Sequence, residues 1–126
     1  MSKVVIVEDD LMIADIAEEV LVEAGYEVCG IARTVEDGVA LARRHSPDLA
    51  LIDLLLPGPG SASGLRTVQI IRQAISPQQL HIIVVSACSQ KELEQAQAEL
   101  PQVPILRKPF KMRQLLELID QMQPAG

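Results

Sequence analysis

The chain has 126 residues, 48% of them hydrophobic, which is typical of one globular domain with its own core. Seventeen acidic against eleven basic residues give a formal charge of −6, and no Lys/Arg-rich run is present, which argues against direct nucleic-acid binding. No apolar run approaches the ~18 residues of a membrane span and no signal-peptide pattern begins the chain, so we expect a cytoplasmic protein without membrane contact.

Short apolar runs alternate with segments of helical period along the chain. Four runs are predicted to be strands buried on both faces, and a fifth is weaker; they span 4–7, 26–32, 49–56, 81–87 and 103–109. The two cysteines, Cys29 and Cys88, lie in apolar strand-like stretches without metal or disulfide spacing. We therefore expect both to be buried thiols.

Helix signals occupy the segments between these runs. The first predicted helix ends near Gly25, and the second begins at Thr34. Apolar stripes mark a third helix within 65–75 and a fifth within 112–122, whereas the fourth is polar and is capped by Ser89. Five strand-helix alternations favour a parallel sheet with helices on both faces, because right-handed crossovers are nearly obligatory.

Charged and hydroxyl side chains gather where the predicted strands end. Ligands of such sheets bind outside the carboxyl ends of the strands. The residues at those ends are Glu8, Asp9 and Asp10 after the first strand, Asp53 in the third, Ser86 in the fourth and Lys108 in the fifth. We expect them to converge on one edge of the sheet.

A cluster of carboxylates at a buried strand end calls for a cation, because like charges repel and unpaired burial is costly. A hard divalent cation such as Mg²⁺ takes oxygen ligands, which Asp9, Asp53 and the backbone carbonyl of Leu55 could supply. Asp53 would then be a nucleophile toward phosphorus, with Lys108 and Ser86 contacting the phosphoryl oxygens. A simpler interpretation has Lys108 neutralising an acidic rim and Ser86 capping the next helix.

Four stretches, VVIVEDD, DLALIDLLLPG, IIVVSA and LRKPF, together resemble the receiver domain of two-component response regulators. The resemblance covers essentially the full chain, residues 1–126. It implies a flavodoxin-like (βα)5 fold with strand order 2-1-3-4-5. It also implies a magnesium-dependent phosphoprotein of a phosphorelay, not an enzyme.

The resemblance also assigns roles to the strand-end residues. Asp53 would be phosphorylated by a histidine kinase or a histidine phosphotransfer protein. Asp9 would bind Mg²⁺ directly and Glu8 mostly through water. Ser86 matches the switch hydroxyl, and Lys108 matches the active-site lysine, followed by a proline with a cis peptide bond. Asp10, the third acid, is expected to interact with the first helix and not with the metal.

We expect no output domain, since the sequence runs to Gly126 just after the fifth helix, and we therefore expect output to pass through a downstream protein target. The protein would be a monomer or a phosphorylation-dependent dimer. Alternatives are a piece of a larger regulator or hybrid kinase, a pseudo-receiver that binds partners without phosphorylation, and a small magnesium-dependent phosphatase. The phosphatase reading is weakened by Leu55, which stands where such enzymes carry a general-acid Asp.

Three features depart from the family pattern. The loop at 57–64 is longer than usual and adjoins Asp53. Ile105 replaces the usual Tyr or Phe, so the switch is expected to depend on Ser86 and the loop after it. Leu55 and Cys88 stand at positions that tune the access of water to the acyl phosphate, and both are less polar than in many relatives.

Overall fold

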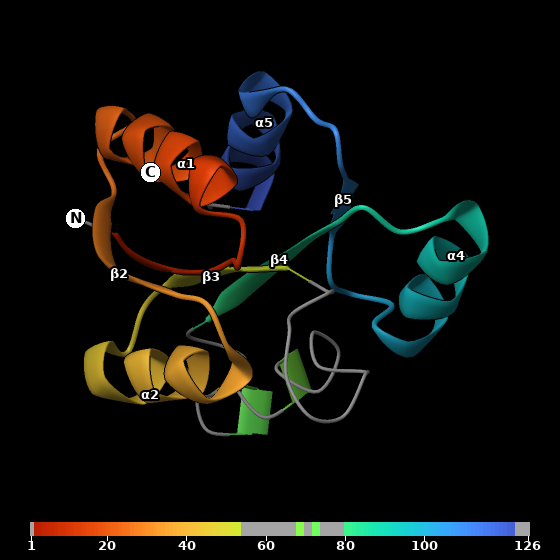
Figure 1. Cartoon of the computed structure of the whole chain (residues 1–126), viewed down its shortest axis with the longest axis horizontal. Helices are drawn as coiled ribbons and strands as arrows, with labels where there is room; N and C mark the ends of the chain where they lie inside the picture. The colour runs from red at the N-terminus through yellow and green to blue at the C-terminus, as the bar shows by residue number, and fades with distance from the viewer. Residues whose placement is uncertain (1, 54–67, 70–71, 74–79, 123–126) are drawn as a thin grey trace.

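A parallel five-stranded sheet lies between layers of helices in the computed structural model, which describes residues 2–53, 68–69, 72–73 and 80–122 (Figure 1). The strands are β1 (Lys3–Val7), β2 (Glu27–Ala32), β3 (Leu49–Asp53), β4 (His81–Ser86) and β5 (Ile105–Arg107). The helices are α1 (Leu11–Glu23), α2 (Val35–His45), α4 (Gln90–Glu99) and α5 (Met112–Met122). The sheet order β2-β1-β3-β4-β5 confirms the predicted topology.

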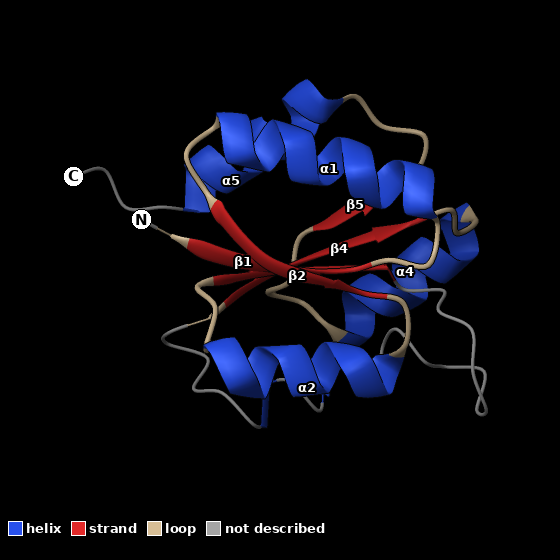
Figure 2. Cartoon of the chain, turned by 60° about the vertical axis from the view of Figure 1, so that its left-hand side comes forward, coloured by secondary structure: helices blue, strands red, loops and turns tan. Residues whose placement is uncertain are grey.

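Two apolar clusters sandwich the sheet, as Figure 2 shows with α1 and α5 on one face and α2 on the other. Val4 and Ile6 of β1 belong to the cluster that includes Ala14 and Leu21 of α1. The alternate residues of β1, Val5 and Val7, belong to the opposite cluster, with α2 residues. Because a central parallel strand is covered on both sides, its sequence is a continuous apolar run.

The prediction that all four main runs are buried on both faces is wrong for β2. This strand forms one edge of the sheet, and the residues from Val28 to Ile31 are only half-buried. Cys29 is therefore half-buried, whereas Cys88, which follows β4, is buried. Burial, and then the negative charge of Glu27, raise the pKa of the Cys29 thiol.

The helix ends follow the signals in the sequence. Asp10 is the N-cap of α1 and accepts hydrogen bonds from the backbone N–H groups of Met12 and Ile13. Gly25 has φ +96°, a left-handed conformation that ends α1 at little steric cost. Thr34 caps α2, and Ser89 caps α4 through a full capping box with Glu92.

Helix α2 lies very close to the end of β1. A Cβ atom placed on Gly38 of α2 would lie 2.9 Å from Cγ2 of Val7, which is shorter than a normal van der Waals contact. Val7 directly precedes Glu8, so glycine at this position lets α2 support the strand end that carries the acidic residues.

Several expectations fall on parts of the chain that are not described. Residues 68–69 and 72–73 of the predicted third helix are helical, and Val68 is fully buried. The loop at 57–64 and Leu55 lie outside the described residues. Among the helices that are described, none combines the length and apolar character needed to cross a membrane.

Candidate functional site

The carboxyl ends of β1 and β3 bring three carboxylates together. Val7 of β1 pairs with Ile52 of β3, so the residues that come next, Glu8 and Asp53, are neighbours. Glu8 is 2% exposed and Asp53 4% exposed, whereas Asp9 is half-buried. One oxygen from each of the three lies within 4.8 Å of the others. The predicted convergence of these acids is therefore present.

Lys108 reaches this cluster from the segment after β5. Its Nζ atom lies 2.6 Å from Oε1 of Glu8 and 3.1 Å from Oδ2 of Asp53. Burial lowers the pKa of Lys108, but the hydrogen bond to Glu8 and the charge of Asp53 outweigh it and raise the pKa overall. Lys108 is therefore a permanent cation that links the ends of β1, β3 and β5.

The pKa of Glu8 is raised although Lys108 forms an ion pair with it. Burial, followed by the hydrogen bond with Asp53, raises the pKa of Glu8 to about 7 despite the opposing hydrogen bond from Lys108. A carboxyl group with this pKa is partly protonated near neutral pH. Three carboxylates lie here beside Lys108, and their mutual repulsion when ionised favours binding of a cation.

The donor set suits a small hard cation. Octahedral ligands at about 2.0–2.1 Å from a metal are about 3–4 Å apart, a spacing that carboxylate oxygens within 4.8 Å of one another can reach. Asp10 is directed elsewhere: its side chain caps α1, and its backbone N–H donates to Oε2 of Glu8 at 3.1 Å. This agrees with the role expected for Asp10.

Ser86 ends β4 beside this cluster. Val85, the residue before it, pairs with Asp53, and the carbonyl of Ser86 accepts a hydrogen bond from the Lys108 N–H at 2.8 Å. Its side chain is completely buried, and Oγ has no hydrogen-bond partner among the described residues. A buried hydroxyl without a partner costs about 1–3 kcal/mol. The Lys108–Pro109 peptide bond is cis, as the resemblance implied.

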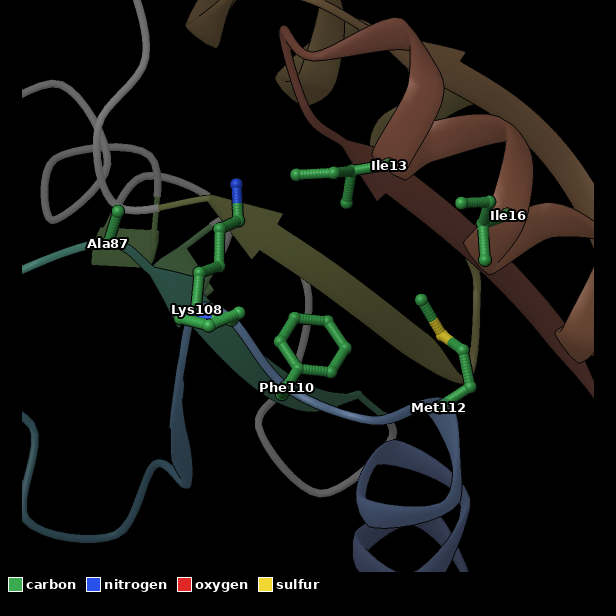
Figure 3. A pocket seen from close by; sticks show the side chains of 7 residues that line it. Ile13, Ile16, Ala87, Lys108, Phe110 and Met112 are labelled. Carbon is green, nitrogen blue, oxygen red and sulfur yellow. The ribbon is translucent and has the colours of Figure 1, made fainter.

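An apolar pocket of about 330 Å³ adjoins the lysine, a feature that the sequence analysis missed (Figure 3). Ile13 and Ile16 of α1 line one side, and Phe110 and Met112 line the other. The first half of α1 also exposes Leu11 and Met12, the latter by 73%. Leu11 and Met12 do not belong to the buried stripe of Ala14, Ala17 and Leu21. Apolar residues outside the buried stripe of a helix could have predicted an exposed apolar surface here.

Arg107 was also missed. It is the last residue of β5 and is exposed, and its guanidinium donates to the Cys88 carbonyl and to the Gln90 side chain, each at 3.2 Å. No periodicity marks an exposed arginine at the end of a strand, so only its position beside Lys108 could have drawn attention to it.

Comparison with known proteins identifies the family. The sequence-family model of the response regulator receiver domain matches residues 4–120. The probable C4-dicarboxylate response regulator DctR of Bacillus subtilis is 33% identical over 123 residues, covering 94% of this chain and 52% of DctR. The chain spans about half the length of the curated relatives it matches.

Solved structures show the same architecture. A CheY-like response regulator receiver domain protein from Methanospirillum hungatei has a TM-score of 0.82 and 26% identity, covering 96% of this chain and 92% of that one. The receiver domain of the sensor histidine kinase PA1611 from Pseudomonas aeruginosa, described with a magnesium ion in its active-site cleft, has a TM-score of 0.81 and 23% identity, covering 95% of each chain. By its fold, its strand-end residues and the match over 4–120, this chain belongs to the response regulator receiver domain family.

Proposed function

We propose that this receiver domain accepts a phosphoryl group on Asp53 from the phosphohistidine of a histidine kinase or histidine phosphotransfer protein. The observation that carries the proposal is the position of Asp53, a buried carboxylate 3.1 Å from the Lys108 ammonium and within the Glu8, Asp9 and Asp53 cluster. Receiver domains of response regulators are generally signalling modules. We propose that this one signals by changing its affinity for a downstream protein.

The metal in this proposal is Mg²⁺. Asp9 and Asp53 would hold it directly and Glu8 would contribute through water, whereas the Leu55 carbonyl remains a prediction outside the described residues. When bound, the ion offsets the negative charge of the incoming phosphoryl group. The three clustered carboxylates beside Lys108 support this assignment, as does the magnesium ion described for the PA1611 receiver domain.

Asp53, Lys108 and Ser86 have separate roles in the phosphoryl transfer. A carboxylate oxygen of Asp53 attacks phosphorus, the new O–P bond forms, and the P–N bond breaks with its electron pair leaving on the donor imidazole. Lys108 is already protonated beside Asp53 and binds a phosphoryl oxygen. Ser86 offers its unpartnered buried hydroxyl as a donor to another.

The apolar pocket beside Lys108 gives the phosphodonor a place to dock. A donor protein must bring its histidine to Asp53, and α1, which follows the acidic residues after β1, exposes Met12 and Ile16, the latter in the pocket wall. Contact through Ile16 is testable because a small phosphodonor needs no docking surface. Ile16→Glu should slow transfer from a phosphorylated histidine phosphotransfer protein that labels the wild type, yet leave labelling by acetyl phosphate unchanged.

Labelling of Asp53 tests the proposal directly. The wild type should gain one phosphoryl group with Mg²⁺ and acetyl phosphate, and Asp53→Asn should gain none, by mass spectrometry of the intact protein. Asp15→Asn, which removes an exposed carboxylate on α1, is the matched control and should label normally. Equal labelling of Asp53→Asn would refute the assignment.

The metal assignment needs its own variant. Asp9→Ala should lose Mg²⁺ binding but stay folded, because removing one of three clustered carboxylates relieves repulsion. A pseudo-receiver that never accepts phosphate would fail to label even as wild type. The filled set of Asp9, Asp53, Ser86 and Lys108 argues against that alternative.

A further inference from the structure

The segment that joins β4 to α4 is held at both ends by two consecutive residues, Arg107 at the end of β5 and Lys108 directly after it. At its start, the Lys108 N–H donates to the Ser86 carbonyl at 2.8 Å. At its end, the Arg107 guanidinium donates to the Cys88 carbonyl and to the Gln90 side-chain carbonyl, each at 3.2 Å. We call the residues between these ties, Ala87 to Ser89, the 87–89 loop.

Arg107 connects this loop to the first turn of α4. Gln90 is the first residue of α4, and its side-chain amide donates onward to the Glu94 carboxylate at 3.2 Å. Arg107 also lies directly opposite Ser86 in the β4–β5 ladder. One guanidinium therefore holds the 87–89 loop and the start of α4 in a fixed relation to the strand that carries Ser86.

The two ends of the loop differ in how completely their polar groups are hydrogen-bonded. At the Ser86 end, a fully buried hydroxyl lacks a hydrogen-bond partner among the described residues, which is unfavourable. At the other end, Arg107 makes an exposed hydrogen bond to the Gln90 side chain and a part-buried one to the Cys88 carbonyl, and bonds made by an arginine at the surface contribute modestly. The loop therefore sits in a conformation that a new acceptor near Ser86 would disfavour and that Arg107 weakly preserves.

We propose that Arg107 is a positioning residue that holds the 87–89 loop in its resting conformation, and that its release from Cys88 and Gln90 accompanies the response of Ser86 to a phosphoryl group. This proposal rests on the proposed phosphorylation of Asp53. Because Arg107 adjoins Lys108, the residue that contacts Asp53 and the residue that holds the loop are consecutive at the end of β5. Arg107 thereby sets how easily the switched state forms.

The test compares Arg107→Ala, Arg107→Lys and the control Arg113→Ala, which removes an exposed charge on α5. In free Arg107→Ala, amide hydrogen exchange at residues 87–90 should accelerate. Its amide NMR signals should move toward the positions of beryllofluoride-bound wild type, and beryllofluoride affinity should rise roughly two- to five-fold. Arg107→Lys keeps the charge but loses the two-armed geometry, so it should show most of the effect.

Gln90→Ala removes one of the two acceptors and should give a smaller change in the same direction, with non-additivity when combined with Arg107→Ala. Unchanged exchange and unchanged signals at residues 87–90 in Arg107→Ala would overturn the proposal, as would a weaker beryllofluoride affinity. Failure of the proposed function looks different: the wild type itself would not bind beryllofluoride. The exchange measurement on the free protein would still decide the role of Arg107.

Discussion

The ends of β1 and β3 and the segment after β4 share one edge of the sheet but are stabilised in different ways. At β1 and β3, buried carboxylates are joined by a lysine through short ion pairs. After β4, the backbone is held by an exposed arginine, and a buried hydroxyl has no partner among the described residues. The first region is built to hold charge in place, and the second to change its hydrogen bonds.

This contrast indicates which residues determine the stability of the fold and which determine its conformational response to a phosphoryl group. Breaking a buried ion pair leaves an uncompensated charge and is costly, whereas exposed hydrogen bonds can be exchanged at small cost. Changes at Lys108 or Glu8 should therefore alter the free energy of unfolding, and removal of the Ser86 hydroxyl should alter the conformational response without a loss of stability.

Lys108→Met should give the largest effect. In metal-free protein at pH 8 it leaves Glu8 and Asp53 buried without their cation, and the free energy of unfolding should fall by about 2–4 kcal/mol in urea denaturation. Saturating Mg²⁺ should recover part of the loss. Lys111→Met removes an exposed lysine and should be neutral. Equal stability of the two variants would show that the ion pairs do not stabilise the fold.

Glu8→Gln should remove a pH dependence. The pKa of Glu8 is about 7 in the fold and near 4.5 when unfolded, so the folded state binds the extra proton between these values. Stability of metal-free protein should therefore fall as pH rises from 4.5 to 7. Glu8→Gln should flatten this slope and stabilise the protein at pH 8 by about 1–3 kcal/mol. An unchanged slope would place the titration on another group.

Ser86, which precedes the 87–89 loop, and Ser89, the last residue of that loop, make a matched pair. Ser89 caps α4 and makes both bonds of a capping box, so Ser89→Ala should cost about 1 kcal/mol. Ser86 makes no side-chain hydrogen bond among the described residues, so Ser86→Ala should not lower stability and should raise it by up to about 1–3 kcal/mol, the cost of the unpartnered hydroxyl. Beryllofluoride-induced shifts at residues 87–89 should nevertheless shrink in Ser86→Ala. A large loss of stability in Ser86→Ala would reveal a structural role.

Ile105 should show the smallest effect. It pairs with Val84 in the sheet and packs against the buried cluster that includes Val84, and a β-branched side chain is stiff at χ1. Its methyl NMR signals should therefore keep their rotamer signature when beryllofluoride binds, although amides of the 87–89 loop move. A rotamer change at Ile105 beside a still loop would locate the switch in β5.

The sheet order and the convergence of the acids were predictable because strand-end position depends on local patterns of apolar runs and polar stops. Glu8, Asp53 and Lys108 were placed correctly for this reason. The half-burial of β2 does not follow from its apolar run alone, although the strand order 2-1-3-4-5 that the resemblance implied already puts this strand at an edge. That difference arises only when strands assemble.

Contacts that depend on side-chain direction also escaped prediction. Lys108 was expected to bind the phosphoryl group or to neutralise an acidic rim, but its specific contact at 2.6 Å with Glu8, a residue 100 positions away, required the fold. Arg107 and the pocket formed by Ile13 and Phe110 likewise combine elements that are distant in the chain. Cys88 was correctly expected to be buried, although it lies after β4 and not within a strand.

Because Gly38 lies so close to Val7, we expect a substitution of Gly38 to impair signalling from a distance. Alanine at 38 would suit a helix by propensity, yet its methyl group would press on the residue that precedes Glu8. A variant there would keep every group of the acidic site and could still fail to pass a signal. In a genetic screen such a variant would have the phenotype of an active-site defect, although Gly38 lies on α2 and packs against the side chain of Val7.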